Sequence, residues 1–154
     1  MENKMHILSE QYVVEHGTDF EEKLWFTSYS DEVLDNPEDE GGSPFNGLAY
    51  ELYENGDLAY YSYYKDGFLE GDFVRFHHNG NVKSLDYMIK GQTRGLRVMW
   101  YDSGEKKYDG EYNFGICLRY TEWDMQGNVT RQKAFPTEGE LKRLERFADH
   151  DQSE

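Results

Sequence analysis

The sequence predicts an all-β fold: an open antiparallel meander of β-hairpins that repeat about every 24 residues, followed by a short C-terminal capping helix. Three observations predict it. Glycines recur at a nearly constant spacing, large apolar residues precede them, and helical spacing appears only after Pro136. Periods of this length indicate a repeat architecture, in which neighbouring units bury one another's apolar faces.

Two series of glycines set the period of the repeat. The first consists of Gly56, Gly80, Gly104 and Gly127, and the second of Gly47, Gly71 and Gly95. Four residues before the first series stand Leu52, Phe76, Trp100 and Trp123. Apolar residues two apart share one face of a strand, and Asn-Gly pairs favour hairpin turns. We therefore expect hairpins over residues 47–133, with an atypical last unit in which Leu118 replaces the opening glycine.

The residues before the repeat divide into two segments. Residues 1–30 are expected to contribute N-terminal strands, over 6–15 and 22–29. Residues 31–46 are expected to form an acidic loop, because they combine Pro and Gly with six acids and no base. A chain of 154 residues fits one domain, so these segments should pack on the hairpins rather than fold alone.

The C-terminal segment has the signals of a helix. Thr137 and Glu140 match a capping box, and Leu141, Leu144 and Phe147 form a stripe at helical spacing. We expect a helix over 137–148 that covers the open edge of the sheet, and a frayed tail over 149–154.

Charge excludes two classes of partner. The formal net charge is −15, and residues 1–57 contain 15 acids and 2 bases. Such a surface repels phosphate backbones and anionic lipids, so direct nucleic-acid or membrane binding is not expected. The same field would steer a basic partner. A single cysteine and the lack of a signal peptide or a membrane-length apolar run predict a cytoplasmic protein.

No catalytic or metal motif is present in the sequence, so we expect no enzyme activity, no metal and no cofactor. His77 and His78 would point to opposite faces of a strand, which favours ordinary structural histidines over a ligand or a pH sensor. Cys117 fits a buried small residue better than a nucleophile.

Two segments are candidate contact surfaces. The acidic loop reads as a solvated surface, as a contact for a basic partner or, less specifically, as a hard-cation site. In the tyrosine cluster 60–64, Tyr60 and Tyr64 should share the core face of Leu58. Tyr61 and Tyr63 should then lie on the opposite face, either packed or as an interface patch, since tyrosine is enriched at interfaces.

Five segments carry a resemblance to a known family: 45–58, 66–71, 78–82, 100–104 and 123–129. They resemble the MORN-like repeats of YwqK-type antitoxin proteins over roughly residues 45–130. The resemblance implies an open sheet of hairpins and a role as an immunity protein that neutralises a polymorphic or contact-dependent bacterial toxin. It supplies no catalytic residues.

The leading hypothesis is therefore an immunity protein whose partner is a cognate toxin domain, expected to be a basic nuclease. The expected partner-binding residues are Asp31, Glu32, Asp35, Glu38, Asp39, Glu40, Glu51, Tyr53, Glu54, Tyr61 and Tyr63. The alternative is a MORN-like interaction scaffold without a toxin partner, and a weaker third is an enzyme with an unrecognised site. The oligomeric state stays open, because a sheet edge can pair with a second copy.

Overall fold

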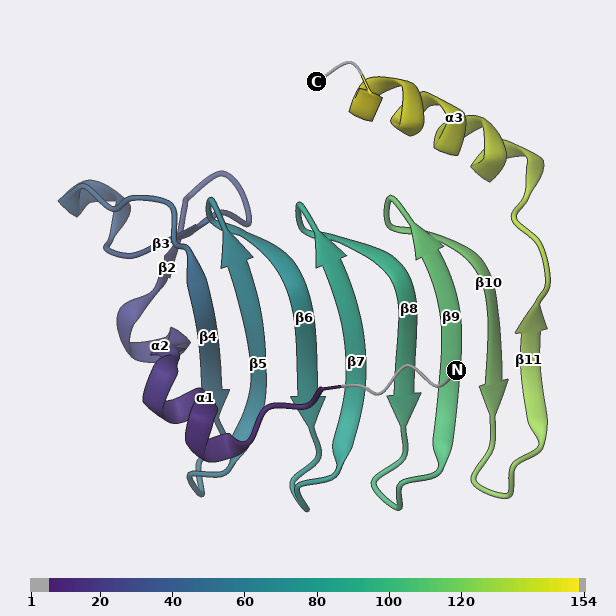
Figure 1. The fold of residues 1–154 in the computed structure, drawn as a ribbon, viewed down its shortest axis with the longest axis horizontal. Helices are drawn as coiled ribbons and strands as arrows, with labels where there is room; N and C mark the ends of the chain where they lie inside the picture. The colour runs from purple at the N-terminus through teal and green to yellow at the C-terminus, as the bar shows by residue number, and fades with distance from the viewer. Residues whose placement is uncertain (1–5, 153–154) are drawn as a thin grey trace.

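The computed structural model describes residues 6–152, and their main feature is an open nine-stranded sheet (Figure 1). Eight strands follow one another in chain order: β4 (Gly47–Leu52), β5 (Leu58–Lys65), β6 (Phe68–Phe76), β7 (Val82–Ile89), β8 (Gln92–Trp100), β9 (Lys106–Asn113), β10 (Ile116–Trp123) and β11 (Val129–Lys133). Each is antiparallel to the next. The short β1 (Thr18–Asp19) joins β4 in parallel. The predicted meander is confirmed.

The two ends of the sheet carry different turns. At the lower end in Figure 1, four-residue turns close on the first glycine series, as where Gly56 N donates to Tyr53 O at 2.9 Å. At the upper end, two-residue turns such as Asp66-Gly67 place both residues at positive φ, which fits the right-handed twist of the flanking strands. The Asn-Gly pairs lie in the lower turns, where Gly56 and Gly80 take positive φ, so the expectation that these pairs form hairpin turns is confirmed.

A register shift recurs after every lower turn and decides which side chains share a face. Glu51 pairs with Tyr60, but Leu52 pairs with Leu58, so Ala59 is an extra residue on β5. Equivalent shifts occur in the next three hairpins. One extra residue moves every following side chain to the other face of the sheet. The prediction for the tyrosine cluster is therefore wrong: Tyr61 shares the core face of Leu58, and Tyr60 lies opposite.

We name the two faces of the sheet, front and back, by the rows of cross-strand neighbours that each face carries. The front face carries the row Tyr50, Tyr61, Val74, Leu85 and Val98, and the back face carries the row Ala49, Ser62, Phe73, Asp86 and Arg97. Residues 6–16 lie against the front face (Figure 1).

The front face has its core under α1 (Glu10–His16). Ser9 caps this helix by accepting a hydrogen bond from Tyr12 N, and Val13 is fully buried. Leu8 N donates to the hydroxyl of Tyr61 at 3.0 Å. The predicted strand over 6–15 is wrong, because the serine cap and the burial of one helical face outweigh the low helix propensity of Val13 and Val14.

The back face is covered near β4 by a second group of short elements. These are α2 (Phe20–Lys23), β2 (Trp25–Phe26) and β3 (Val33–Leu34). The 3-10 turn η1 (Glu38–Glu40) follows them and has no buried residue. Strand β2 pairs antiparallel with β3, so the expected strand over 22–29 is correct only at two residues. Leu24, Val33 and Ala49 form a small core here. We call residues 25–34 the β2–β3 arm.

Helix α3 (Glu138–Gln152) confirms the C-terminal prediction and its cap. Glu140 N donates to Thr137 Oγ1 at 3.1 Å, and Thr137 N donates to Glu140 Oε1 at 2.8 Å. The helix continues four residues past Ala148, so the prediction of a frayed tail is wrong for residues 149–152. Residues 153–154 of the predicted tail lie outside the described residues. No helix in residues 6–152 has the length and apolar character to cross a bilayer.

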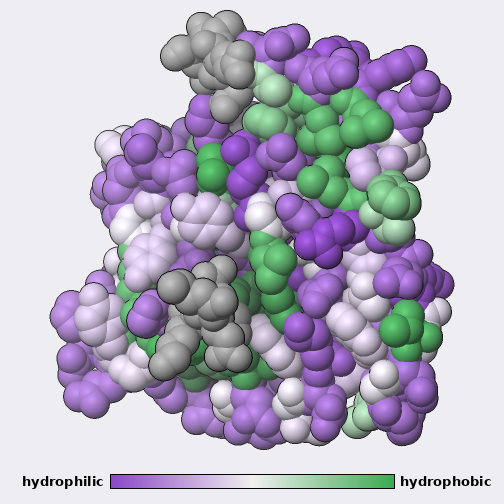
Figure 2. Space-filling view, turned by 45° about the vertical axis from the view of Figure 1, so that its right-hand side comes forward, coloured by the Kyte–Doolittle hydropathy of each residue, from purple (hydrophilic) through white to green (hydrophobic). Residues whose placement is uncertain are grey.

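The position of α3 differs from the expectation. The helix lies over the upper ends of the last hairpins, where Phe147 stacks on Phe114 at 5.5 Å (Figure 1). Strand β11 remains exposed except at Lys133, so the helix does not cover that edge. Leu141 stays 48% exposed, and Figure 2 shows hydrophobic surface gathered below the helix, near the top of the molecule.

Candidate functional site

A cavity of about 680 Å³ lies on the back face, between the first strands of the sheet and the β2–β3 arm. Its lining consists of Phe20, Phe26, Ser30, Asp31, Glu51, Tyr60, Tyr64, Phe68, Leu69, Phe73, Lys90 and Gly91. Its size lies within the range of small-ligand sites. We call it the aromatic cavity.

The rings that line the aromatic cavity hold one another in place. Phe20 lies 5.4 Å from Phe26 and 6.2 Å from Tyr64, and Tyr60 lies 5.5 Å from Phe73, between ring centroids. Tilted ring pairs at such distances are favourable. The rings come from α2, the β2–β3 arm and the sheet, so the aromatic walls are formed before any partner arrives.

Two carboxylates with different origins reach this cavity. Asp31 belongs to the arm, whereas Glu51 belongs to β4 and lies opposite Tyr60 in the pairing of β4 with β5. Burial and then the charge of Glu51 raise the pKa of Tyr60. Burial also raises the pKa of Tyr64. Both phenols therefore stay protonated at neutral pH and serve as hydrogen-bond donors.

Backbone hydrogen bonds hold the arm over the cavity. Val33 N donates to Gly67 O at 2.7 Å, and Gly67 N donates to Phe45 O at 2.9 Å. Gly67 has φ +86°, and a Cβ there would lie 2.6 Å from Glu32 Cγ and 3.1 Å from Val33 O. Only glycine meets both demands. The upper turn between β5 and β6 thus places Asp31 beside the cavity.

The acidic loop is an ordered structure with exposed charges. Asp35 accepts a hydrogen bond from Ser43 N at 2.8 Å, and Glu38 accepts one from Ser28 N at 3.1 Å. Its six acids are exposed, except for the half-buried Glu32. Within residues 6–152, none of the six carboxylates forms an ion pair with a base. The described residues also contain no group of three or more potential metal ligands.

The remaining predicted contact residues do not gather at this place. Tyr61 is 1% exposed, so it is a core residue and not a surface contact. Tyr63 packs against the front core. Tyr53 donates its hydroxyl to Phe76 O and stacks on His78 at 3.8 Å, at the lower end. Glu54 is exposed in the adjacent turn.

The structure therefore brings together Asp31 and Glu51 from the predicted set and adds Tyr60, which sequence reasoning assigned to the front core. The extra residue after each lower turn is what turns Tyr60 toward the back face. This residue can be recognised only from the strand pairing, because its side chain is not distinctive.

Side chains at the lower end connect each repeat unit to the next. Tyr53 bonds to Phe76 O, and one unit later His77 Nε2 bonds to Trp100 O at 2.8 Å. Tyr101 then donates to Trp123 O at 2.8 Å. His77 thus has a structural contact, in line with the interpretation favoured by the sequence.

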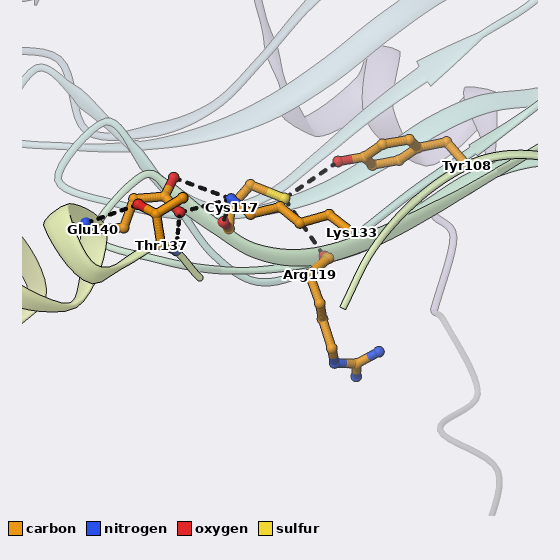
Figure 3. A network of polar contacts seen from close by, with 6 residues as sticks. All are labelled: Tyr108, Cys117, Arg119, Lys133, Thr137 and Glu140. Atoms are coloured by element: carbon orange, nitrogen blue, oxygen red, sulfur yellow. Dashed lines mark hydrogen bonds and ion pairs between the residues drawn. The ribbon is translucent and has the colours of Figure 1, made fainter. Parts of the chain in front are cut away.

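A second polar cluster joins α3 to the sheet (Figure 3). Lys133 Nζ donates to Cys117 O at 2.8 Å and to Glu140 Oε1 at 2.8 Å. Tyr108 lies 3.7 Å from Cys117 Sγ through its hydroxyl, and burial raises the pKa of Tyr108. Lys133 and Thr137 lower the pKa of Glu140 to about 2. These contacts anchor the helix.

Comparison with known proteins gives one informative match. Over 71 residues, or 46% of this chain, the sequence is 56% identical to a protein named Immunity protein YwqK from Bacillus subtilis (strain 168). The match covers 44% of that protein, so the chain spans less than half of its length. No family model and no solved structure matches the chain. The similarity confirms the resemblance to YwqK-type immunity proteins that the repeat units indicated.

Proposed function

We propose that this protein is an immunity protein, which binds a bacterial toxin and blocks its activity through direct protein contact. The observation that carries the proposal is the 56% identity to an immunity protein over 71 residues. The fold suits the role, because an open sheet presents two broad faces and two rows of turns to a second protein.

The charge distribution supports a basic toxin, and we propose a nuclease acting in the cytoplasm. A nuclease must hold phosphate, so the surface around its active site carries positive charge. The net negative charge of this chain is concentrated before residue 58, where 15 acids face 2 bases. The acids of the loop are exposed, except for the half-buried Glu32, and lack ion pairs with the described bases. Opposite charges on the two surfaces accelerate association and discriminate against wrong partners.

The loop and the neighbouring aromatic cavity are the proposed binding surface. The acidic loop and the aromatic cavity adjoin one another, because Asp31 belongs to the loop and also lines the cavity. A charged rim beside an aromatic, concave centre is the arrangement found in specific protein interfaces. Inhibition then follows because the toxin's basic surface is occupied by this protein and not by its substrate.

Co-expression tests the proposed function. The toxin candidate is the protein encoded beside this gene, expressed from a tightly controlled promoter in a bacterial host. We expect this chain to restore growth and to co-purify with an inactivated form of that toxin. The variant in which the six loop acids are neutralised serves as a comparison for the acidic loop.

Growth that stays arrested, together with no co-purification, would overturn the proposal. A nuclease assay on the purified toxin tests the finer statement separately, because a toxin that is bound and inhibited but cleaves no nucleic acid overturns only the nuclease assignment. Stable capture of a protein without toxicity, and no rescue, would favour the scaffold alternative.

A further inference from the structure

We propose that the aromatic cavity receives the guanidinium group of an arginine side chain from the partner protein. The inference deepens the proposed function and rests on it for the identity of the partner. The chemistry of the cavity itself is argued from its lining residues.

The rings provide the first part of the binding site. Phe20, Phe26, Tyr60 and Tyr64 line the cavity and contact one another or neighbouring rings. A cation is attracted to the face of an aromatic ring, most strongly where the site is partly desolvated. A planar guanidinium also stacks on such rings, whereas a compact ammonium does not.

The carboxylates provide the second part. Asp31 and Glu51 line the same space, and neither forms an ion pair with a base among the described residues. Lys90 also lines the cavity, so the lining keeps one net negative charge. Two acids can accept hydrogen bonds from the fork of guanidinium donors and offset its desolvation.

The back face shows the same chemistry within the chain. Arg97 lies 4.9 Å from the ring centroid of Tyr112, and its Nε donates to the buried carboxylate of Asp86. Arg75 lies 4.7 Å from the ring centroid of Phe73, which itself lines the cavity. The sheet therefore already holds one guanidinium group between a ring and an acid, that of Arg97, and a second over a ring, that of Arg75. The cavity lining holds the rings and the acids but contains no arginine.

Probe binding tests the cavity without any toxin. We would titrate the full chain with N-acetyl-arginine methylamide and follow backbone amide signals by NMR. The expected result is shifts at the lining residues and at least tenfold weaker binding by the variant Asp31→Asn/Glu51→Gln. The matched control, Asp102→Asn/Glu105→Gln, removes the same charges at exposed positions outside both the cavity and the acidic loop and should bind like the parent.

Two further probes define the specificity. N-acetyl-lysine methylamide and N-acetyl-norleucine methylamide should bind at least tenfold more weakly than the arginine probe. Equal binding of either probe, or binding by Asp31→Asn/Glu51→Gln equal to that of the control, would overturn the proposal. Asp31→Asn alone is a second variant whose folding is not at risk, because Asp31 is exposed.

The toxin complex separates this inference from the proposed function. If Asp31→Asn/Glu51→Gln and its control bind the toxin equally, the arginine site is wrong and the immunity function stands. If the arginine probe binds but no toxin is bound, the immunity function is wrong and the guanidinium chemistry of the cavity stands.

Discussion

The backbone N–H of Leu8 donates a 3.0 Å hydrogen bond to the hydroxyl of Tyr61, and this contact joins the N-terminal segment to the front face of the sheet. Tyr61 lies between Leu58 and Val74 in the core and is 1% exposed. Burial raises its pKa, so the hydroxyl remains protonated through the physiological range.

Tyr61→Phe should destabilise the protein by about 1 kcal/mol, because the part-buried Leu8 N–H loses its acceptor. Urea unfolding measures the change, and amide exchange at Leu8 and Val13 locates it. Tyr29→Phe, at a residue 77% exposed, is the control and should change neither measurement. Unaltered exchange at Leu8 in Tyr61→Phe would show that the bond does not hold the segment.

Gly67→Ala should destabilise the protein by about 1–3 kcal/mol, because its Cβ would meet Glu32 and Val33 at a positive φ. The β2–β3 arm should loosen first, which amide exchange at Val33 and Phe45 would report. Gly139→Ala is the contrasting variant, since nothing lies near its added methyl group. It should raise stability by up to about 1 kcal/mol. If the two substitutions changed stability equally, the Gly67 turn would not be what holds the β2–β3 arm over the cavity.

Acid should weaken the anchor of α3 through Glu140. Its carboxylate accepts hydrogen bonds from Lys133 and Thr137, which lower its pKa from 4.5 to about 2. A lowered folded-state pKa means that the stabilisation is complete above about pH 4.5 and is lost as the pH falls toward 2. The difference in unfolding free energy between the parent and Glu140→Gln should therefore shrink over this window. Glu145→Gln, on the exposed side of the helix, should show no such trend.

Neutralising the six acids of the loop should slow association with the toxin by roughly tenfold or more at low salt and flatten its salt dependence. Stopped-flow fluorescence measures both. A control variant loses six exposed acids elsewhere: Glu15, Asp102, Glu105, Glu138, Glu145 and Asp149. If both variants associate at the same rate, net charge rather than the loop governs the encounter.

The hairpin repeat was predictable because it depends on local signals. Glycines such as Gly56 take a positive φ, and Phe76 and Val74 mark one face of a strand. The face of Tyr60 was not predictable from these signals, since the extra residue at Ala59 has an ordinary side chain and appears only in the pairing of β4 with β5. One unpaired residue was enough to exchange the core and surface tyrosines.

The N-terminal helices and the cavity depended on contacts far apart in sequence. Ser9 and Asp19 are N-caps of residue types that a sequence alone can indicate. A helix as short as α1 is nevertheless stable only because Val13 is buried against the sheet. Asp31 and Glu51 were both predicted as contacts, on separate grounds. Their convergence required the Gly67 turn to hold the β2–β3 arm over the back face.

The lower-end bonds from Tyr53, His77 and Tyr101 each reach the next unit in the same way, which makes the molecule extensible. The aromatic cavity is complete by Gly91, and the cluster that anchors α3 begins at Tyr108. Duplication of one 24-residue module between them would add two strand spacings, roughly 9.5 Å. A chain with such an insertion would reach further across a partner while keeping the lining of the aromatic cavity unchanged.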